Sequence, residues 1–159
     1  MNLYIVRHTD AEYLGTGPGG ERQITEEGRR WLENSVKQWK KFIPRIDLIV
    51  SSPALRTQQT AEVIGGGLGY EGEVVVSKSL QSGTAIADVY SYLHSNREEN
   101  ILLVMHEPEV SLLTMNATGT GSIEFYFKPG TLAKIVFPGK MRPHTGKLHY
   151  FLPPDVFVQ

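Results

Sequence analysis

The sequence predicts an α/β fold, a three-layer αβα sandwich with a mostly parallel central sheet. Short apolar runs typical of buried strands alternate along the chain with longer segments in which apolar residues recur every three or four positions, as in amphipathic helices. The last two apolar runs follow each other without a helix, which indicates a closing hairpin. We expect residues 1–159 to form one domain, because this length suffices to bury a core.

The first half of the chain predicts three strands and two helices. The strands are expected at 3–6, 47–50 and 74–76. Thr25 can cap a helix that Pro44 stops. Ser52 and Pro53 are a cap and a first-turn proline for a second helix, which we expect the glycines at 65–67 to end.

The second half predicts two more helices and three more strands. The helices are expected at 85–94 and 108–115, and the strands at 101–105, 132–137 and 148–152. The final two strands should form a hairpin through residues 139–146. Trp31 and Trp39, both in the first helix, are expected to pack in the core rather than to form a ligand platform.

Segment 11–23, between the first strand and the first helix, holds four glycines around Pro18. This glycine density predicts a mobile surface loop beside the site. A flexible entrance and a plain linker both remain open. No Gly-Lys-Ser/Thr follows the glycines, so the segment is not a nucleotide-binding phosphate loop.

Three of the expected parallel strands deliver basic residues where they end. These residues are Arg7, His8, Arg56 and His106. Ligands of open α/β sheets bind beyond the carboxyl ends of the strands, so we expect the four side chains to converge on one pocket. Two arginines suit a phosphoryl group, because the planar guanidinium matches its oxygens bidentately and stays charged.

The two histidines add chemistry that a simple anion site does not need. A neutral imidazole is a nucleophile, so His8 can attack phosphorus and carry the phosphoryl group covalently. His106 would donate hydrogen bonds to the transferring oxygens, and one such donor commonly lowers the barrier by ~3 kcal/mol. The four residues therefore predict covalent phosphoryl transfer.

Three motifs in order resemble the histidine phosphatase superfamily, with its phosphoglycerate mutase-like fold. They are Arg7-His8, Ser52-Pro53-x-x-Arg56-x-x-Gln59-Thr60-Ala61 and Met105-His106-Glu107-Pro108. Segments 22–28 and 148–154 also resemble the family, so the likeness covers nearly the whole chain. It is nearest to the small bacterial SixA-type phosphohistidine phosphatases.

The resemblance implies a role for each matching residue. His8 corresponds to the phosphorylated nucleophile, His106 to the second histidine, and Arg7 and Arg56 to the phosphate-binding pair. Arg22 matches a family arginine and either reaches the substrate or is a plain surface charge. The implied enzyme is a phosphoric ester hydrolase that uses no cofactor and no metal.

The implied substrate is phosphohistidine on a protein, hydrolysed through a covalent phosphohistidine enzyme intermediate. The partner would be a phosphorylated protein, such as a phosphotransfer domain, or a small phosphate ester. Two alternatives stay open: a small-molecule phosphomonoesterase of the same superfamily, and a catalytically weak phosphate- or phosphoprotein-binding module.

The chain departs from the family pattern at two places. Thr9 stands where the family has glycine, and it either narrows the approach to the phosphate or contacts the ligand through its hydroxyl. Larger relatives carry a glutamate acid where this chain has the segment 80–83, Leu-Gln-Ser-Gly. An alkoxide leaving group needs such an acid more than an imidazole does, so the gap favours a phosphoramidate substrate.

Glu107 and Asp10 are the candidate substitutes for this acid, with Glu107 preferred. Glu107 can equally act as a helix cap before Pro108. Asp10 can equally orient an imidazole or Arg7. Tyr126 and Lys128 precede a strand and are candidates for the border of the pocket, which the sequence alone does not decide.

Composition excludes several classes of protein. Sixteen Lys and Arg balance seventeen Asp and Glu, so no overall field attracts nucleic acid or an acidic membrane. The sequence has no cysteine, no apolar run approaching ~20 residues and no recognisable secretion signal, so we expect a cytoplasmic monomer. Two arginines would repel a metal held by His8, His106 and a carboxylate, and no His-x-x-x-His spacing occurs.

Overall fold

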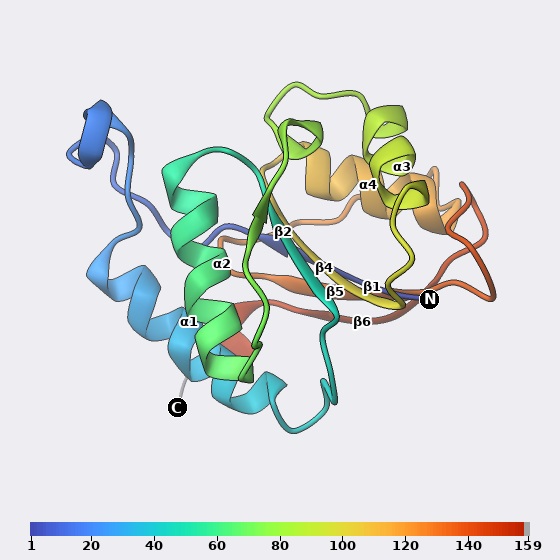
Figure 1. The fold of residues 1–159 in the computed structure, drawn as a ribbon, viewed down its shortest axis with the longest axis horizontal. Helices are drawn as coiled ribbons and strands as arrows, with labels where there is room; N and C mark the ends of the chain where they lie inside the picture. The colour runs from blue at the N-terminus through green and yellow to red at the C-terminus, as the bar shows by residue number, and fades with distance from the viewer. Residues whose placement is uncertain (158–159) are drawn as a thin grey trace.

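A computed structural model describes residues 1–157 of the chain. It contains one six-stranded sheet in the order β3-β2-β4-β1-β5-β6 (Figure 1). The strands are β1 (Asn2–Arg7), β2 (Leu48–Ser51), β3 (Val75–Val76), β4 (Asn100–Met105), β5 (Leu132–Val136) and β6 (Lys147–Leu152). The helices are α1 (Glu26–Trp39), α2 (Leu55–Leu68), α3 (Ile86–His94) and α4 (Glu109–Thr118), with short 3-10 turns η1 (Pro18–Gly20), η2 (Lys78–Leu80) and η3 (Pro154–Phe157).

The sheet is covered by helices on both faces, which confirms the predicted αβα sandwich. Figure 1 shows α1 and α2 on one side of the sheet and α3 and α4 on the other. Successive residues of β1 alternate between the two cores: Leu3 and Ile5 pack with α3 and α4, whereas Tyr4 and Val6 pack with α1 and α2. Burial on both faces explains the uninterrupted apolar runs of the central strands.

Strands β1 to β4 pair in parallel, and β5 and β6 pair antiparallel. β1 lies between β4 and β5, and β4 lies between β1 and β2. The carboxyl ends of β1, β2 and β4 therefore meet at one edge of the sheet. The closing hairpin of β5 and β6 is as predicted, with a register shift between Lys134 and Ile135.

Helix α1 begins as the sequence predicts and ends earlier. The Thr25 hydroxyl accepts a hydrogen bond from the Gly28 N–H, which confirms Thr25 as the cap. The helix stops at Trp39, ahead of Pro44. Trp39 is fully buried, but Trp31 is 39 % exposed, so the expectation of core packing for Trp31 is wrong. Its position in α1 turns it away from the sheet.

Helix α2 differs from the prediction at both ends. It begins at Leu55 after Ala54, so Ser52 is not its cap. The glycines at 65–67 lie inside the helix, which instead ends at Gly69 with a φ of 74°. A Cβ on Gly67 would lie 2.4 Å from Val36 Cγ1, so the glycine allows α2 to approach α1 closely. Gly67 therefore serves helix packing, and none of the three glycines terminates the helix.

Helix α4 is longer than predicted. It begins at Glu109, with Pro108 as its cap, and continues through Thr118 to Gly119, whose φ is 72°. Among residues 1–157, no helix combines the length and apolar character that a membrane crossing requires.

Candidate active site

The four residues predicted to converge do meet at the carboxyl edge of the sheet. The ring centroids of His8 and His106 lie 5.4 Å apart, with 63° between the ring planes. Arg56 Nη2 lies 3.2 Å from His106 Nδ1. Arg7 and Arg56 each lower the pKa of both histidines, so both guanidinium groups are within electrostatic range of the two rings.

The hydrogen bond of His8 defines which ring nitrogen is free. His8 Nδ1 lies 2.7 Å from the carbonyl oxygen of Thr9. A carbonyl oxygen can only accept, so Nδ1 carries the proton and donates it. Burial, reinforced by the charges of His106, Arg56 and Arg7, lowers the pKa of His8 to about 3. His8 is therefore neutral at pH 7, with an unprotonated Nε2.

His106 is also a neutral imidazole, held from both sides. Its Nε2 lies 2.8 Å from Ser52 Oγ, and its Nδ1 faces Arg56 Nη2. A guanidinium group can only donate, so Nδ1 accepts, and Nε2 donates to the Ser52 hydroxyl. Burial and the arginine charges lower the pKa of His106 to about 4, although Glu109 opposes this shift.

The two arginines have unused hydrogen-bonding capacity. Arg7 Nη1 donates to the carbonyl oxygen of Phe127 at 2.6 Å. The Nε atoms of Arg7 and Arg56 are buried without a partner. Within residues 1–157, neither guanidinium group has a carboxylate within 4 Å. Partly buried, uncompensated cations favour the binding of an anion.

A cavity of about 320 Å³ opens at this edge of the sheet. It is lined by Glu21, Ser52, Pro53, Ala54, Arg56, Lys78, Gln81, Ser82 and His106. Of the four residues predicted to share one pocket, Arg56 and His106 line this cavity, whereas Arg7 and His8 do not. Arg22 is exposed and close enough to Arg56 to lower its pKa, while burial is the larger cause of that shift. Arg22 Nε donates to the carbonyl oxygen of Glu12, so Arg22 lies at the rim with its loop.

Four residues of the site were missed by the sequence interpretation. Lys78 follows β3, so the rule that located Arg7 at a strand end would have indicated it. Glu21 lines the cavity, and its Oε1 accepts from Leu55 N at the start of α2. Ser52, which the sequence predicts to cap a helix, instead contacts His106. Glu109 gave no sequence signal, because its burial depends on a distant contact.

The two candidate proton donors have partners of their own. Glu107 is half-buried, and its Oε1 accepts from Ser111 Oγ at 2.6 Å. Asp10 is exposed, and its Oδ2 accepts from Thr25 Oγ1 at 2.9 Å. Glu107 thus braces the first turn of α4, and Asp10 braces the start of α1 rather than an imidazole.

Thr9 is buried and its hydroxyl is committed within the protein. Thr9 Oγ1 donates to the carbonyl oxygen of Gly28 at 2.9 Å. The Thr9 N–H donates to Thr60 Oγ1 at 3.2 Å. The Thr9 side chain therefore ties the end of β1 to α1, and its hydroxyl proton is not available to a ligand.

Tyr126 and Lys128 line a separate cavity of about 380 Å³ beside Thr9, which they share with Trp31. They do not line the cavity of Arg56 and His106. Lys128 forms an ion pair with Asp155. The possibility that both residues border the phosphate pocket is therefore not supported.

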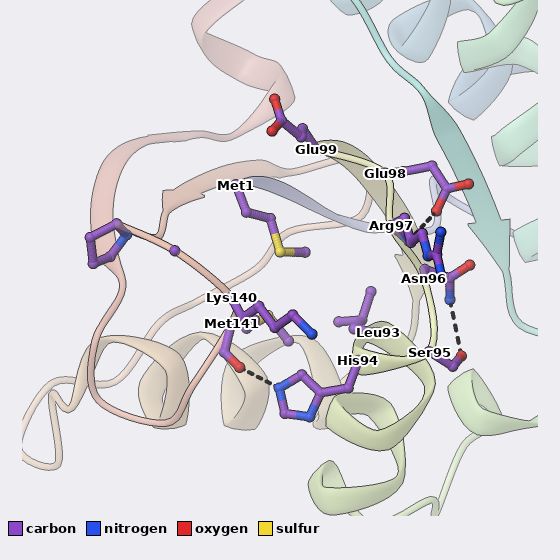
Figure 2. A pocket seen from close by; sticks show the side chains of 12 residues that line it. Met1, Leu93, His94, Ser95, Asn96, Arg97, Glu98, Glu99, Lys140 and Met141 are labelled. Carbon is purple, nitrogen blue, oxygen red and sulfur yellow. Dashed lines mark hydrogen bonds between the residues drawn. The ribbon is translucent and has the colours of Figure 1, made fainter.

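A larger cavity, of about 730 Å³, lies at the opposite edge of the sheet. Figure 2 shows His94 and Lys140 among its lining side chains, with His94 Nε2 bonded to the carbonyl oxygen of Met141. Met1 and Glu99 place it at the amino ends of β1 and β4. None of Arg7, His8, Arg56 and His106 lines it, so the volume of a cavity does not by itself identify the candidate active site.

Within residues 1–157, no group of three or more histidine, aspartate or glutamate side chains is arranged to hold a metal ion. The cavity is lined by the Arg56 guanidinium, the Lys78 ammonium, the His106 imidazole and hydroxyl groups, with Glu21 as the acidic side chain. This set suits an oxyanion such as phosphate.

Comparison with known proteins identifies the relatives of this fold. The Histidine phosphatase superfamily (branch 1) matches residues 3–82, which include Arg7, His8 and Arg56. No curated protein matches the sequence. Among solved structures, the protein histidine phosphatase SixA complexed with tungstate superposes with a TM-score of 0.85 at 22% identity, over 99% of this chain and 100% of that chain.

Two further structures show the same fold. The putative phosphohistidine phosphatase SixA from Agrobacterium tumefaciens has a TM-score of 0.77 at 21% identity, with 96% of this chain and 97% of that chain covered. A putative alpha-ribazole-5'-P phosphatase from Escherichia coli has a TM-score of 0.73 at 16% identity, with 97% and 98% covered. From its sequence match and this shared fold, the chain belongs to the histidine phosphatase superfamily.

Proposed function

We propose that this chain is a phosphatase that hydrolyses phosphohistidine on a protein through a phosphorylated His8. The observation that carries the proposal is the geometry of His8. Its Nδ1 proton is committed to the Thr9 carbonyl, which leaves the Nε2 lone pair free beside two arginines without carboxylate partners. A neutral, oriented imidazole next to an anion site is what nucleophilic attack on phosphorus requires.

The reaction takes two steps. In the first, His8 Nε2 attacks phosphorus, the P–N bond of the substrate phosphohistidine breaks, and the departing imidazole nitrogen takes up a proton from solvent. In the second, water attacks the phosphorus on His8, the P–Nε2 bond breaks, and inorganic phosphate leaves. The attacking water gives one proton to solvent, so the two solvent protons cancel and His8 is again neutral.

Arg7, Arg56 and His106 have the same task in both steps. Negative charge develops on the non-bridging phosphoryl oxygens, and guanidinium and imidazole N–H groups stabilise that charge. A bound dianion would also compete with His106 Nδ1 for the Arg56 N–H. Binding would then free Nδ1 to take up a proton from solvent and to donate a hydrogen bond to a phosphoryl oxygen.

The scarcity of free acids in the cavity favours phosphohistidine, a phosphoramidate, over a phosphate ester as the substrate. Among residues 1–157, Glu21 is the one carboxylate that lines the cavity, and one of its oxygens accepts a hydrogen bond from Leu55 N. Glu107, the donor favoured by the sequence, is bonded to Ser111. An imidazole leaves with less protonic assistance than an alkoxide, so the site has less need of a strong acid. The likeness to two SixA phosphatases supports the same substrate class.

The decisive experiment traps the intermediate. Incubation with a ³²P-labelled phosphohistidine protein should leave label on the wild-type chain that is lost in acid and stable in base. His8→Ala should carry no label, whereas His94→Ala, at the opposite edge of the sheet, should label normally. Label on His8→Ala would reject His8 as the nucleophile.

A substrate panel separates the proposal from its two alternatives. Rates on phosphohistidine protein, phosphoramidate and small phosphate esters are compared under the same conditions. We expect the phosphohistidine protein to have the highest kcat/KM. Preference for a small ester would indicate a phosphomonoesterase, and phosphate binding without turnover would indicate a binding module.

A further inference from the structure

Glu109 is a buried carboxylate that the proposed steps do not use. It is the first residue of α4 and is only 4 % exposed. Its Oε1 accepts a hydrogen bond from the Gly83 N–H at 2.7 Å. Its Oε2 is buried without any partner among the described residues. A carboxylate buried in this way is costly, so its presence calls for a compensating role.

The hydrogen bond between Gly83 and Glu109 connects α4 to the wall of the cavity that Arg56 and His106 line. Gly83 belongs to the turn at 81–84, between η2 and α3, and has a φ of 85°. Gln81 and Ser82 of the same turn line the cavity together with Arg56 and His106. Through its hydrogen bond, Glu109 fixes the distance between this turn and the helix that follows His106.

Glu109 also acts on His106 electrostatically. The charged or titratable groups around His106 are Arg7 and His8 at the end of β1, Arg56 in the first turn of α2, Glu21 and Lys78, which line the same cavity, and Glu109. Arg56 and Arg7 lower the pKa of His106, and Glu109 raises it. Among the groups that shift this pKa, Glu109 is the negative one.

This charge matters because of how His106 is bonded. The one ring proton, on Nε2, is directed at Ser52, and Nδ1 accepts from Arg56. To donate to a phosphoryl oxygen through Nδ1, His106 must take up a second proton beside two arginines. A nearby carboxylate lowers the electrostatic cost of that second proton.

We propose that Glu109 is a positioning residue, which anchors the 81–84 turn to α4 and supplies the negative charge that lets His106 hold its second proton when phosphate is bound. The proposal rests on the proposed function, because it assigns Glu109 a purpose within phosphoryl transfer. Glu109 does not line the cavity and acts through Gly83 and His106.

The test separates the charge of Glu109 from its hydrogen bond. Glu109→Gln keeps the shape and the oxygen that accepts from Gly83 but removes the charge. Glu109→Asp keeps the charge and shortens the reach to Gly83. Asp88→Asn, an exposed acidic residue in the first turn of α3, is the matched control for loss of one charge. Urea unfolding of each variant confirms that it is folded.

The readouts are the titration of His106, followed by NMR of its ring with inorganic phosphate bound, and kcat and KM as functions of pH. In Glu109→Gln, we expect the proton affinity of His106 to fall about threefold or more. The acidic limb of kcat should shift in the same direction, with little change in KM. Glu109→Asp should keep the titration and raise KM.

An unchanged titration of His106 in Glu109→Gln would overturn the charge role. An equal shift in Asp88→Asn would show a nonspecific effect and would also overturn it. Titration and inorganic phosphate binding need no turnover, so they stand if wild type fails to hydrolyse phosphohistidine. That failure would reject the proposed function, whereas an unchanged titration rejects only the role of Glu109.

Discussion

Ser52 Oγ lies 2.8 Å from His106 Nε2, although 54 residues separate the two in the chain. The contact joins the end of β2 to the end of β4, which are neighbours in the sheet. Because Arg56 donates to the other ring nitrogen, the Ser52 hydroxyl accepts the single ring proton of His106. Ser52 therefore sets the tautomer of a residue that is proposed to contact the phosphoryl group.

Ser52→Ala should lower kcat and stability together. The His106 N–H would be left buried without an acceptor, which costs about 1–3 kcal/mol. We expect the free energy of unfolding to fall by about 1–3 kcal/mol. We expect kcat to fall about tenfold or more. Steady-state kinetics and urea unfolding measure the two effects.

The matched control is Ser51→Ala. The Ser51 hydroxyl is also buried and donates to the Ser52 carbonyl, but it has no contact with His106. The Ser51→Ala variant should be less stable than wild type and should keep most of its kcat. Equal loss of activity in the two variants would argue that Ser52 has no specific effect on His106.

Arg56→Ala should weaken the binding of inorganic phosphate. Each charge-assisted hydrogen bond to the anion contributes about 1.5–3 kcal/mol, so the Kd should rise at least about tenfold. Isothermal titration calorimetry measures the change. Arg45→Ala, which removes a mostly exposed arginine paired with Asp47, should leave the Kd unchanged. Equal phosphate affinity in wild type and Arg56→Ala would remove Arg56 from the site.

The protein should lose stability as the pH falls from 7 to 5. The folded-state pKa is about 3 for His8 and about 4 for His106, both below the unfolded value of about 6.5. Below that value the unfolded chain binds more protons than the folded chain, so acid favours unfolding. Each histidine should contribute about 2 kcal/mol over this range.

Urea unfolding at both pH values checks this prediction in wild type and in the two single histidine-to-asparagine variants. Asparagine does not titrate, so each variant should lose its share of the pH dependence. An identical dependence in all three proteins would show that neither histidine is held neutral in the folded state.

Glu107→Gln should slow the hydrolysis of an alkyl phosphate ester more than that of phosphohistidine. If Glu107 protonates the leaving group, its loss costs the ester about 10²-fold or more, and the less basic imidazole loses less. Glu21→Gln is the comparison, because Glu21 lines the cavity. If the rate on the ester falls more selectively in Glu21→Gln than in Glu107→Gln, Glu21 is the proton donor. If each variant slows both substrates equally, neither residue acts as a general acid.

The amino-acid sequence was sufficient to predict the sheet and the convergence of Arg7, His8, Arg56 and His106. Strands buried on both faces must be apolar throughout, so they are recognisable in isolation. The polar residues that interrupt them mark the carboxyl edge, where ligands bind in such sheets. Both features are local in the chain, and the helix cap at Thr25 is local in the same way.

Features that depend on residues far apart in the chain could be recognised only in the three-dimensional fold. Gly67 lies inside α2, where Val36 of α1 leaves no room for a Cβ. Ser52 faces a histidine of another strand instead of capping a helix, and Glu109 is buried because Gly83 reaches it. These contacts form between segments that are far apart in the chain, so the residues next to each side chain do not indicate its partner.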